Sequence, residues 1–197
     1  MSRYTTASMA ALLAIFMLST AAFGSVTIST WNTSNTIHSN GWAYAAQTFV
    51  APGNDLTDYS VGFYNQYPAG QLSFSVYAWS GNSPVGSALF STTSLSWIGD
   101  GYTTGTINVA LTPGNEYGVV LAWGGSSFDY LVYGNDSYSG GIGYWSQDAV
   151  NWTAYPEYDE QFTAVFNGTT TPEPTSLLLL GSGVLGLAGI IRRKVNL

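Results

Sequence analysis

The side chains that could carry chemistry are few in this chain of 197 residues. There is no cysteine, and the single histidine, His38, lies in the polar segment 34–40 without a Gly-x-Ser-x-Gly nucleophile elbow. The absence of cysteine excludes thiol nucleophiles, disulfides, iron–sulfur clusters and zinc–thiolate sites, and one histidine cannot form a histidine-cluster metal site. We therefore interpret His38 as a solvated loop residue.

The acidic cluster at 157–160, Glu-Tyr-Asp-Glu, is the remaining candidate for catalysis. Paired carboxylates perform glycoside hydrolysis, and the cluster superficially resembles the Glu-x-Asp-x-x-Glu strand of laminarinase-like hydrolases. The position of the final acid is occupied by Phe162, so a residue that this chemistry requires is missing. The pattern predicts a chain that is not an enzyme, in which the cluster is an exposed acidic loop; a glycan hydrolase remains the third alternative.

The four basic residues all lie near the termini: Arg3, Arg192, Arg193 and Lys194. Ten of the eleven acidic residues lie within 25–171, where no side chain is positively charged. Nothing in this segment can neutralise phosphates, so nucleic acid is excluded as a partner. Attraction to anionic lipid headgroups is excluded for the same reason.

Uncompensated carboxylates in turns point to a hard cation as an alternative. Asp55 and Asp58 follow Gly53-Asn54, and Asp136 follows Gly134-Asn135, so either loop offers the oxygen ligands that calcium prefers. Neither loop matches a calcium-binding signature, and turns use the same residue types for backbone reasons. A structural calcium ion is therefore an alternative to no cofactor at all.

Aromatic residues are concentrated between the two ends of the chain. All seven Trp and all but one of the 14 Tyr lie within 25–171, more rings than one core easily buries. Exposed rings stack on the C–H faces of sugars, which makes a neutral glycan a candidate ligand; core packing and half-exposed tyrosines are the alternative. The candidate rings are Tyr77, Trp79, Trp123 and Trp145.

The N-terminus has the three parts of a secretory signal peptide. Arg3 precedes an apolar run at 9–18, and the small residues Ala22 and Gly24 flank Phe23 before a predicted cut at Ser25. An amphipathic first helix of the domain is the alternative. The sequence predicts a signal peptide at 1–24 and export across the inner membrane.

The C-terminus contains a short apolar helix between two polar motifs. Pro172-Glu173-Pro174 precedes an uncharged run at 175–191, and the basic triplet 192–194 follows it. Seventeen helical residues extend about 25 Å, the short end of a membrane-spanning helix. The basic triplet predicts a cytoplasmic stop, with everything before Pro172 outside.

This tail, 172–197, resembles the PEP-CTERM sorting signal of Gram-negative bacteria, many of which make exopolysaccharide. The resemblance implies that a membrane enzyme, exosortase, recognises Pro172, Glu173 and Pro174 and processes the chain. It also implies an inner-membrane anchor before processing and a location at the cell surface or in the extracellular matrix afterwards. An ordinary single-pass anchor is the alternative.

The segment 25–171 alternates in hydrophobicity as strands do. Leu72, Phe74, Val76 and Ala78 share one face, and 117–123 is apolar on both faces, as in a covered central strand. Glycine and asparagine turns separate the predicted strands, which lie near 26–31, 46–51, 58–66, 72–79, 87–97, 104–111, 117–123, 128–133, 143–146 and 161–166. We expect an all-β ectodomain, an antiparallel β-sandwich of the jelly-roll kind.

Together these features predict an exported, exosortase-processed surface or matrix protein with a structural or adhesive role in an exopolysaccharide layer. A carbohydrate-binding module that recognises a neutral glycan is the second alternative. An aromatic patch on a concave sheet would favour that second alternative.

Overall fold

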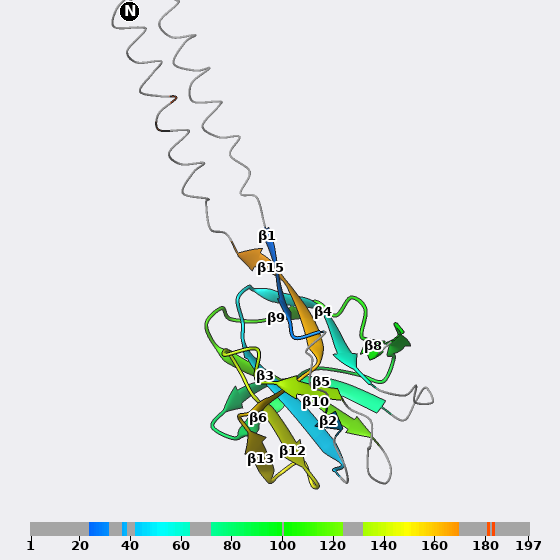
Figure 1. Ribbon diagram of the computed structural model, residues 1–197. Helices are drawn as coiled ribbons and strands as arrows, with labels where there is room; N and C mark the ends of the chain where they lie inside the picture. The colour runs from blue at the N-terminus through cyan, green and yellow to red at the C-terminus, as the bar shows by residue number, and fades with distance from the viewer. Residues whose placement is uncertain are drawn as a thin grey trace, which may run out of the picture. The chain divides into compact units, whose positions relative to one another are not determined.

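The computed structural model describes residues 24–31, 37–38, 42–63, 72–99, 101–123 and 132–169, together with Gly181 and Gly183. Residues Gly24–Thr169 form a compact unit, close to the expected ectodomain at 25–171 (Figure 1). No described helix is long and apolar enough to cross a membrane. The predicted helix at 175–191 lies outside the described residues except for the two glycines, and the signal peptide except for Gly24, so both stay predictions.

The described strands form three antiparallel sheets, which we call sheets 1, 2 and 3. Sheet 1 contains, in spatial order, β1 (Gly24–Ser29), β15 (Phe162–Thr169), β4 (Asp55–Gly62), β8 (Gly101–Thr103) and β7 (Ser96–Trp97), with β9 (Val109–Ala110) also paired to β4. Sheet 2 contains β13 (Trp152–Tyr155), β12 (Gly143–Ser146), β3 (Tyr44–Val50), β10 (Glu116–Trp123), β5 (Leu72–Ser80) and β6 (Ser83–Thr92). Sheet 3 contains β14 (Tyr158–Glu160), β11 (Val132–Asn135) and β2 (Ile37–His38).

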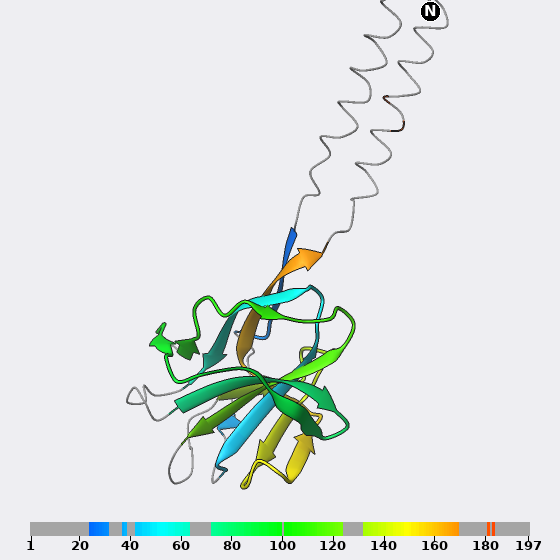
Figure 2. The same cartoon turned by 180° about the vertical axis from the view of Figure 1, so that it is seen from behind.

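Sheets 1 and 2 have the strand order of a jelly roll. The order β1-β15-β4-β8 in sheet 1 is matched by β3-β10-β5-β6 in sheet 2, and the chain crosses repeatedly between the two layers. Figure 2 shows the two layers from behind. The strands β11 to β14 are inserted between β10 and β15, and β12 and β13 extend sheet 2 at one edge. The expected antiparallel β-sandwich is confirmed.

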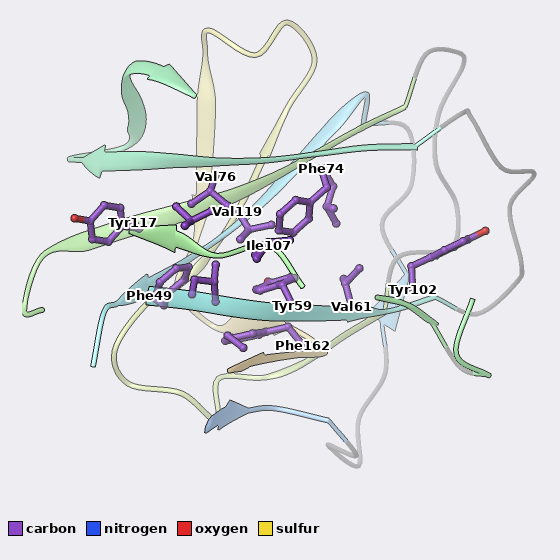
Figure 3. Packing of buried hydrophobic residues seen from close by; sticks show 14 of the residues in the cluster. Phe49, Tyr59, Val61, Phe74, Val76, Tyr102, Ile107, Tyr117, Val119 and Phe162 are labelled. Atoms are coloured by element: carbon purple, nitrogen blue, oxygen red, sulfur yellow. The ribbon is translucent and has the colours of Figure 1, made fainter. Parts of the chain in front are cut away.

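The core lies between sheets 1 and 2, and it consists of the side chains on the inward-pointing face of the strands in both sheets. Phe49 of β3 lies 5.4 Å from Phe166 of β15, and Tyr59 of β4 lies 5.3 Å from Phe74 of β5, measured between ring centroids. Figure 3 shows Phe49, Tyr59 and Phe74 among the inward-pointing side chains that meet between the two layers. Burial of this kind contributes roughly 25 cal/mol per Å² of apolar surface removed from water.

Two predicted strands were wrong. The segment 87–97 is divided between β6 of sheet 2 and β7 of sheet 1, with residues 93–95 in neither strand. The segment 104–111 contains Gly105 and Asn108 at positive φ, 66° and 48°, which ends the extended conformation, so only Val109 and Ala110 pair with β4. Before these two residues, Thr104 and Ile107 make only isolated backbone hydrogen bonds to β4, to the carbonyls of Tyr59 and Thr57 at 2.9 and 3.0 Å. Periodicity alone does not reveal such a break, because apolar residues alternate through it.

Candidate functional site

Five aromatic side chains gather on the face of sheet 2 that points away from sheet 1. This outer aromatic layer consists of Tyr44, Tyr77, Trp79, Tyr144 and Trp152, packed with small aliphatic residues and separate from the main core. Trp79 and Tyr144 are 5% and 3% exposed, whereas Tyr44, Tyr77 and Trp152 are partly exposed. The layer therefore has a buried base and a partly exposed surface.

The contacts within this layer require sheet 2 to curl. The ring of Trp79, on β5, lies 4.9 Å from that of Tyr144 on β12 and 5.5 Å from that of Trp152 on β13. In a flat sheet, β5 would be about 14 Å from β12 and about 19 Å from β13. The hydroxyl of Tyr144 also donates to the carbonyl of Gly81, beyond the end of β5, at 3.3 Å. Sheet 2 is thus concave on the side of the aromatic layer, as strong strand twist allows.

Gly118 makes room for the centre of the layer. It lies on β10 opposite Tyr77, and a Cβ atom built on it would lie 2.4 Å from Cε3 of Trp79. The indole ring therefore rests directly against the backbone of β10. A glycine is required here because of this close approach rather than because of its φ angle.

The turn between β12 and β13 fixes the other edge of the layer. The indole N–H of Trp152 donates to the carbonyl of Ala149 at 3.1 Å, and the Trp152 ring meets Tyr44 edge-on at 6.4 Å. The carboxylate of Asp148 accepts the backbone N–H groups of Asn151 and Val150 at 2.7 and 2.9 Å. These hydrogen bonds, with that of Asn151 the strongest, hold the pKa of Asp148 well below its usual range.

The acidic cluster joins the three sheets from inside. Oδ2 of Asp159 accepts the N–H groups of Ser137 and Tyr138 at 2.9 and 2.8 Å, and Oδ1 accepts Nε2 of Gln47 at 2.8 Å. Oε1 of Gln47 in turn accepts the N–H of Glu160 at 2.8 Å. Burial raises the pKa of Asp159, and the three hydrogen bonds act in the opposite direction.

The expectation of an exposed acidic loop at 157–160 was wrong for Asp159 and Glu160, and only Glu157 is an exposed acid. Asp159 and Glu160 are 1% and 0% exposed and belong to β14. The Tyr59 hydroxyl lies 3.5 Å from Oε2 of Glu160, so this carboxyl also faces a protein donor. Gln47, at an inward position of an apolar strand, was the overlooked signal, since a buried amide needs polar partners.

The C-terminal segment matches a known family model at residues 170–194, described as the PEP-CTERM protein-sorting motif. The chain carries a PEP-CTERM sorting motif. The match begins directly after β15 and contains Pro172, Glu173, Pro174 and the basic triplet Arg192, Arg193 and Lys194. No curated protein matches the chain.

The PEP-CTERM motif marks the chain as an exported protein that an exosortase sorts to the cell surface. The residues of the motif named above lie outside the described residues, as does Ala22 at the predicted signal cleavage site. Gly24 and Ser25, which flank the predicted cut, open β1 and pair with Thr169 and Asn167 of β15. The predicted cleavage before Ser25 would therefore fall at the start of a strand.

Two of the four candidate glycan rings, Trp79 and Trp145, are buried. Tyr77 and Trp79 do point away from the core, but Trp79 is covered by its aromatic neighbours. Trp145 is on the inner face, 8% exposed, with its ring 4.2 Å from Tyr155. The side chain of Trp123 lies outside the described residues.

Sequence reasoning missed the other partly exposed rings, Tyr44 and Trp152. Both lie in one row across sheet 2, because Tyr44 pairs with Ser146, which pairs with Trp152. The available signal was the spacing of two residues between Tyr44 and the small residue Ala46, which places both side chains on one face of β3. The position of Trp152 in the same row could not be predicted in this way, because it depends on the long-range pairing of β12 with β3.

The cation candidates lie on separate sheets. Asp55 and Asp58 are on β4 of sheet 1, where Asp58 accepts the Thr103 hydroxyl at 2.9 Å, and Asp136 is an exposed residue directly after β11 of sheet 3. Within the described part of the chain, no group of three or more His, Cys, Asp or Glu residues is placed to hold a metal ion. Asp55 and Asp58 therefore lie in a strand and not in the expected loop. A calcium site at either position stays a prediction.

Proposed function

We propose that the mature chain is a non-catalytic structural or adhesive protein of an extracellular polysaccharide layer, released into that layer by an exosortase. The observation that carries this proposal is the PEP-CTERM motif at 170–194, which follows the last strand of a compact all-β unit without an intervening domain. A structural role is further supported by Asp159 and Glu160 of the acidic cluster, whose carboxylates are buried and face protein donors.

A carbohydrate-binding module is the second candidate, and the concave outer aromatic layer favours it. Three partly exposed rings on a fixed base offer the apolar contact that sugars accept. Binding and structural roles are compatible in a protein that adheres to polysaccharide.

The sorting step is tested by replacing Pro172, Glu173 and Pro174 with alanine in the native host. The two prolines cannot join a regular helix, so they hold an extended segment of the kind that proteases bind. We expect the triple variant to accumulate as an uncleaved, membrane-associated precursor, because its hydropathy is barely changed. Cell fractionation and mass spectrometry of the C-terminus measure this.

Substitution of Thr170 and Thr171 with alanine is the matched control, since it alters the same stretch but leaves the three motif residues. This variant should be processed like the wild type and be recovered with the polysaccharide. If mature wild-type protein retains residues 180–197, or stays with the membrane, the proposed function is wrong.

A further inference from the structure

We infer that the outer aromatic layer binds a neutral polysaccharide, with Tyr44, Tyr77 and Trp152 as contacting rings and Trp79 and Tyr144 as their fixed base. The inference rests on the proposed function, because export to a polysaccharide layer supplies the ligand. Its argument comes from the shape, rigidity and charge of the face.

Two of the three contacting rings, Tyr44 and Trp152, are held in place before a ligand arrives. Trp152 is bonded through its indole N–H to Ala149 and packs on both Tyr44 and Trp79. Trp79 in turn rests on Gly118. Binding to such a face immobilises few side chains, which removes much of the entropic cost of association.

The chemistry of the face suits a sugar chain. Pyranose rings present C–H groups on one side, which the electron-rich faces of Tyr and Trp attract, and hydroxyls around the edge. The exposed side chains of Asp148 and Asn151 border the rings at the β12–β13 turn. Ser75 and Ser91, whose hydroxyls lie 2.9 Å apart on β5 and β6, border them on the other side. Polar groups therefore flank an apolar centre, as in known small-molecule and glycan sites.

The charge of the chain restricts the ligand to a neutral one. Between 25 and 171 there are ten acidic residues and no Lys or Arg, so uronate, sulfate or phosphate groups would meet only like charge. The same argument disfavours a second copy of this chain as the occupant. Two such faces would bring four carboxylates, those of Asp148 and Glu116 in each copy, into one interface without a cation to pair them.

The test is affinity electrophoresis of the full-length chain in a zwitterionic detergent that contains no sugar. The gels contain β-glucan, galactomannan or dextran as neutral probes and alginate as the anionic comparison. We expect at least one neutral probe to retard the wild type and alginate not to. Tyr77→Ala and Trp152→Ala should each weaken that binding at least tenfold, while Tyr77→Trp should retain it.

Trp97→Ala is the matched control, because Trp97 is a partly exposed indole on sheet 1. Melting temperatures identify variants that fail to fold, and Tyr77→Ala alone decides the matter if Trp152→Ala is unstable. Three binding results would overturn the inference. The first is that no neutral probe retards the wild type, and the second is that alginate retards it equally. The third is that folded Tyr77→Ala binds the glycan as the wild type does. A change in the oligomeric state of Tyr77→Ala by light scattering, without a loss of glycan binding, would overturn it as well.

The two proposals fail separately. If Tyr77→Ala protein keeps wild-type glycan binding but is still processed and recovered with the polysaccharide, the inference is wrong and the proposed function stands. If wild-type protein remains in the membrane, the proposed function is wrong whatever the gels show.

Discussion

Replacing Gly118 with alanine tests whether the outer aromatic layer is packed as tightly as its contacts indicate. The new Cβ would lie 2.4 Å from Cε3 of Trp79, whereas ordinary contacts begin at 3.4 Å, so the indole must move by about 1 Å. Tyr144 and Trp152 contact the same indole and restrict where it can move. Overpacking of this kind costs about 1–3 kcal/mol.

Alanine also restricts the unfolded chain, which offsets about 0.4–1 kcal/mol of that cost. The net loss of unfolding free energy is about 1–2 kcal/mol. For a domain of this size, that lowers the melting temperature by about 3–6 °C. Thermal unfolding followed by circular dichroism, in the full-length chain and its variants, measures the loss.

A double-mutant cycle with Trp79→Phe separates this clash from other effects. The smaller ring should relieve most of the strain, giving a coupling energy of about 1 kcal/mol or more. Gly114→Ala is the control: Gly114 has φ +84° and nothing near its Cβ position, so its cost should add to that of Trp79→Phe. If the losses of unfolding free energy in Gly118→Ala and Trp79→Phe are additive within about 0.5 kcal/mol in the double variant, the packing argument is refuted.

Three further outcomes follow from the polar groups. Because its folded pKa is lowered, Asp148 stabilises the fold above about pH 4. The difference in melting temperature between the wild type and Asp148→Ala should therefore be largest near neutral pH and become smaller below about pH 4. Because the folded pKa of Asp159 is raised, the stability that this residue contributes is greatest below about pH 4 and is lost as the pH rises. The difference in melting temperature between the wild type and Asp159→Asn should therefore fall from about pH 4 to 7. A difference that rises over this range would contradict the raised pKa. If Asp55 and Asp58 of β4 hold calcium, millimolar calcium should raise the melting temperature of the wild type but not of the double variant Asp55→Asn, Asp58→Asn, and identical wild-type values in chelator and calcium would exclude that site.

The sandwich itself was predictable because each strand of the main core buries one face. The alternation at 72–79 placed Phe74 and Val76 inside and Tyr77 and Trp79 outside, as observed. The same alternation did not predict that Trp79 is buried. Burial on the outer face depends on how far sheet 2 curls, and curling arises from the twist of six paired strands rather than from the pattern of one.

The acidic cluster shows a second limit of sequence reasoning. Four polar residues next to a predicted strand are typical of an exposed loop, and solvation of a carboxylate normally favours exposure. Asp159 is buried nevertheless, because Gln47 and two backbone N–H groups from elsewhere in the chain supply the hydrogen bonds that water would. Such partners are distant in sequence, and only the folded chain brings them together.

The place of β15 in sheet 1 has a mechanical consequence. It is the last strand before the sorting motif, and it lies between β1 and β4 with antiparallel ladders on both sides. A pull on the C-terminal end of β15 acts along the strand, so the hydrogen bonds of both ladders bear the load together in shear instead of opening one after another. Before exosortase releases the chain, a load between the membrane and polysaccharide bound on sheet 2 would therefore fall on both ladders of β15 at once.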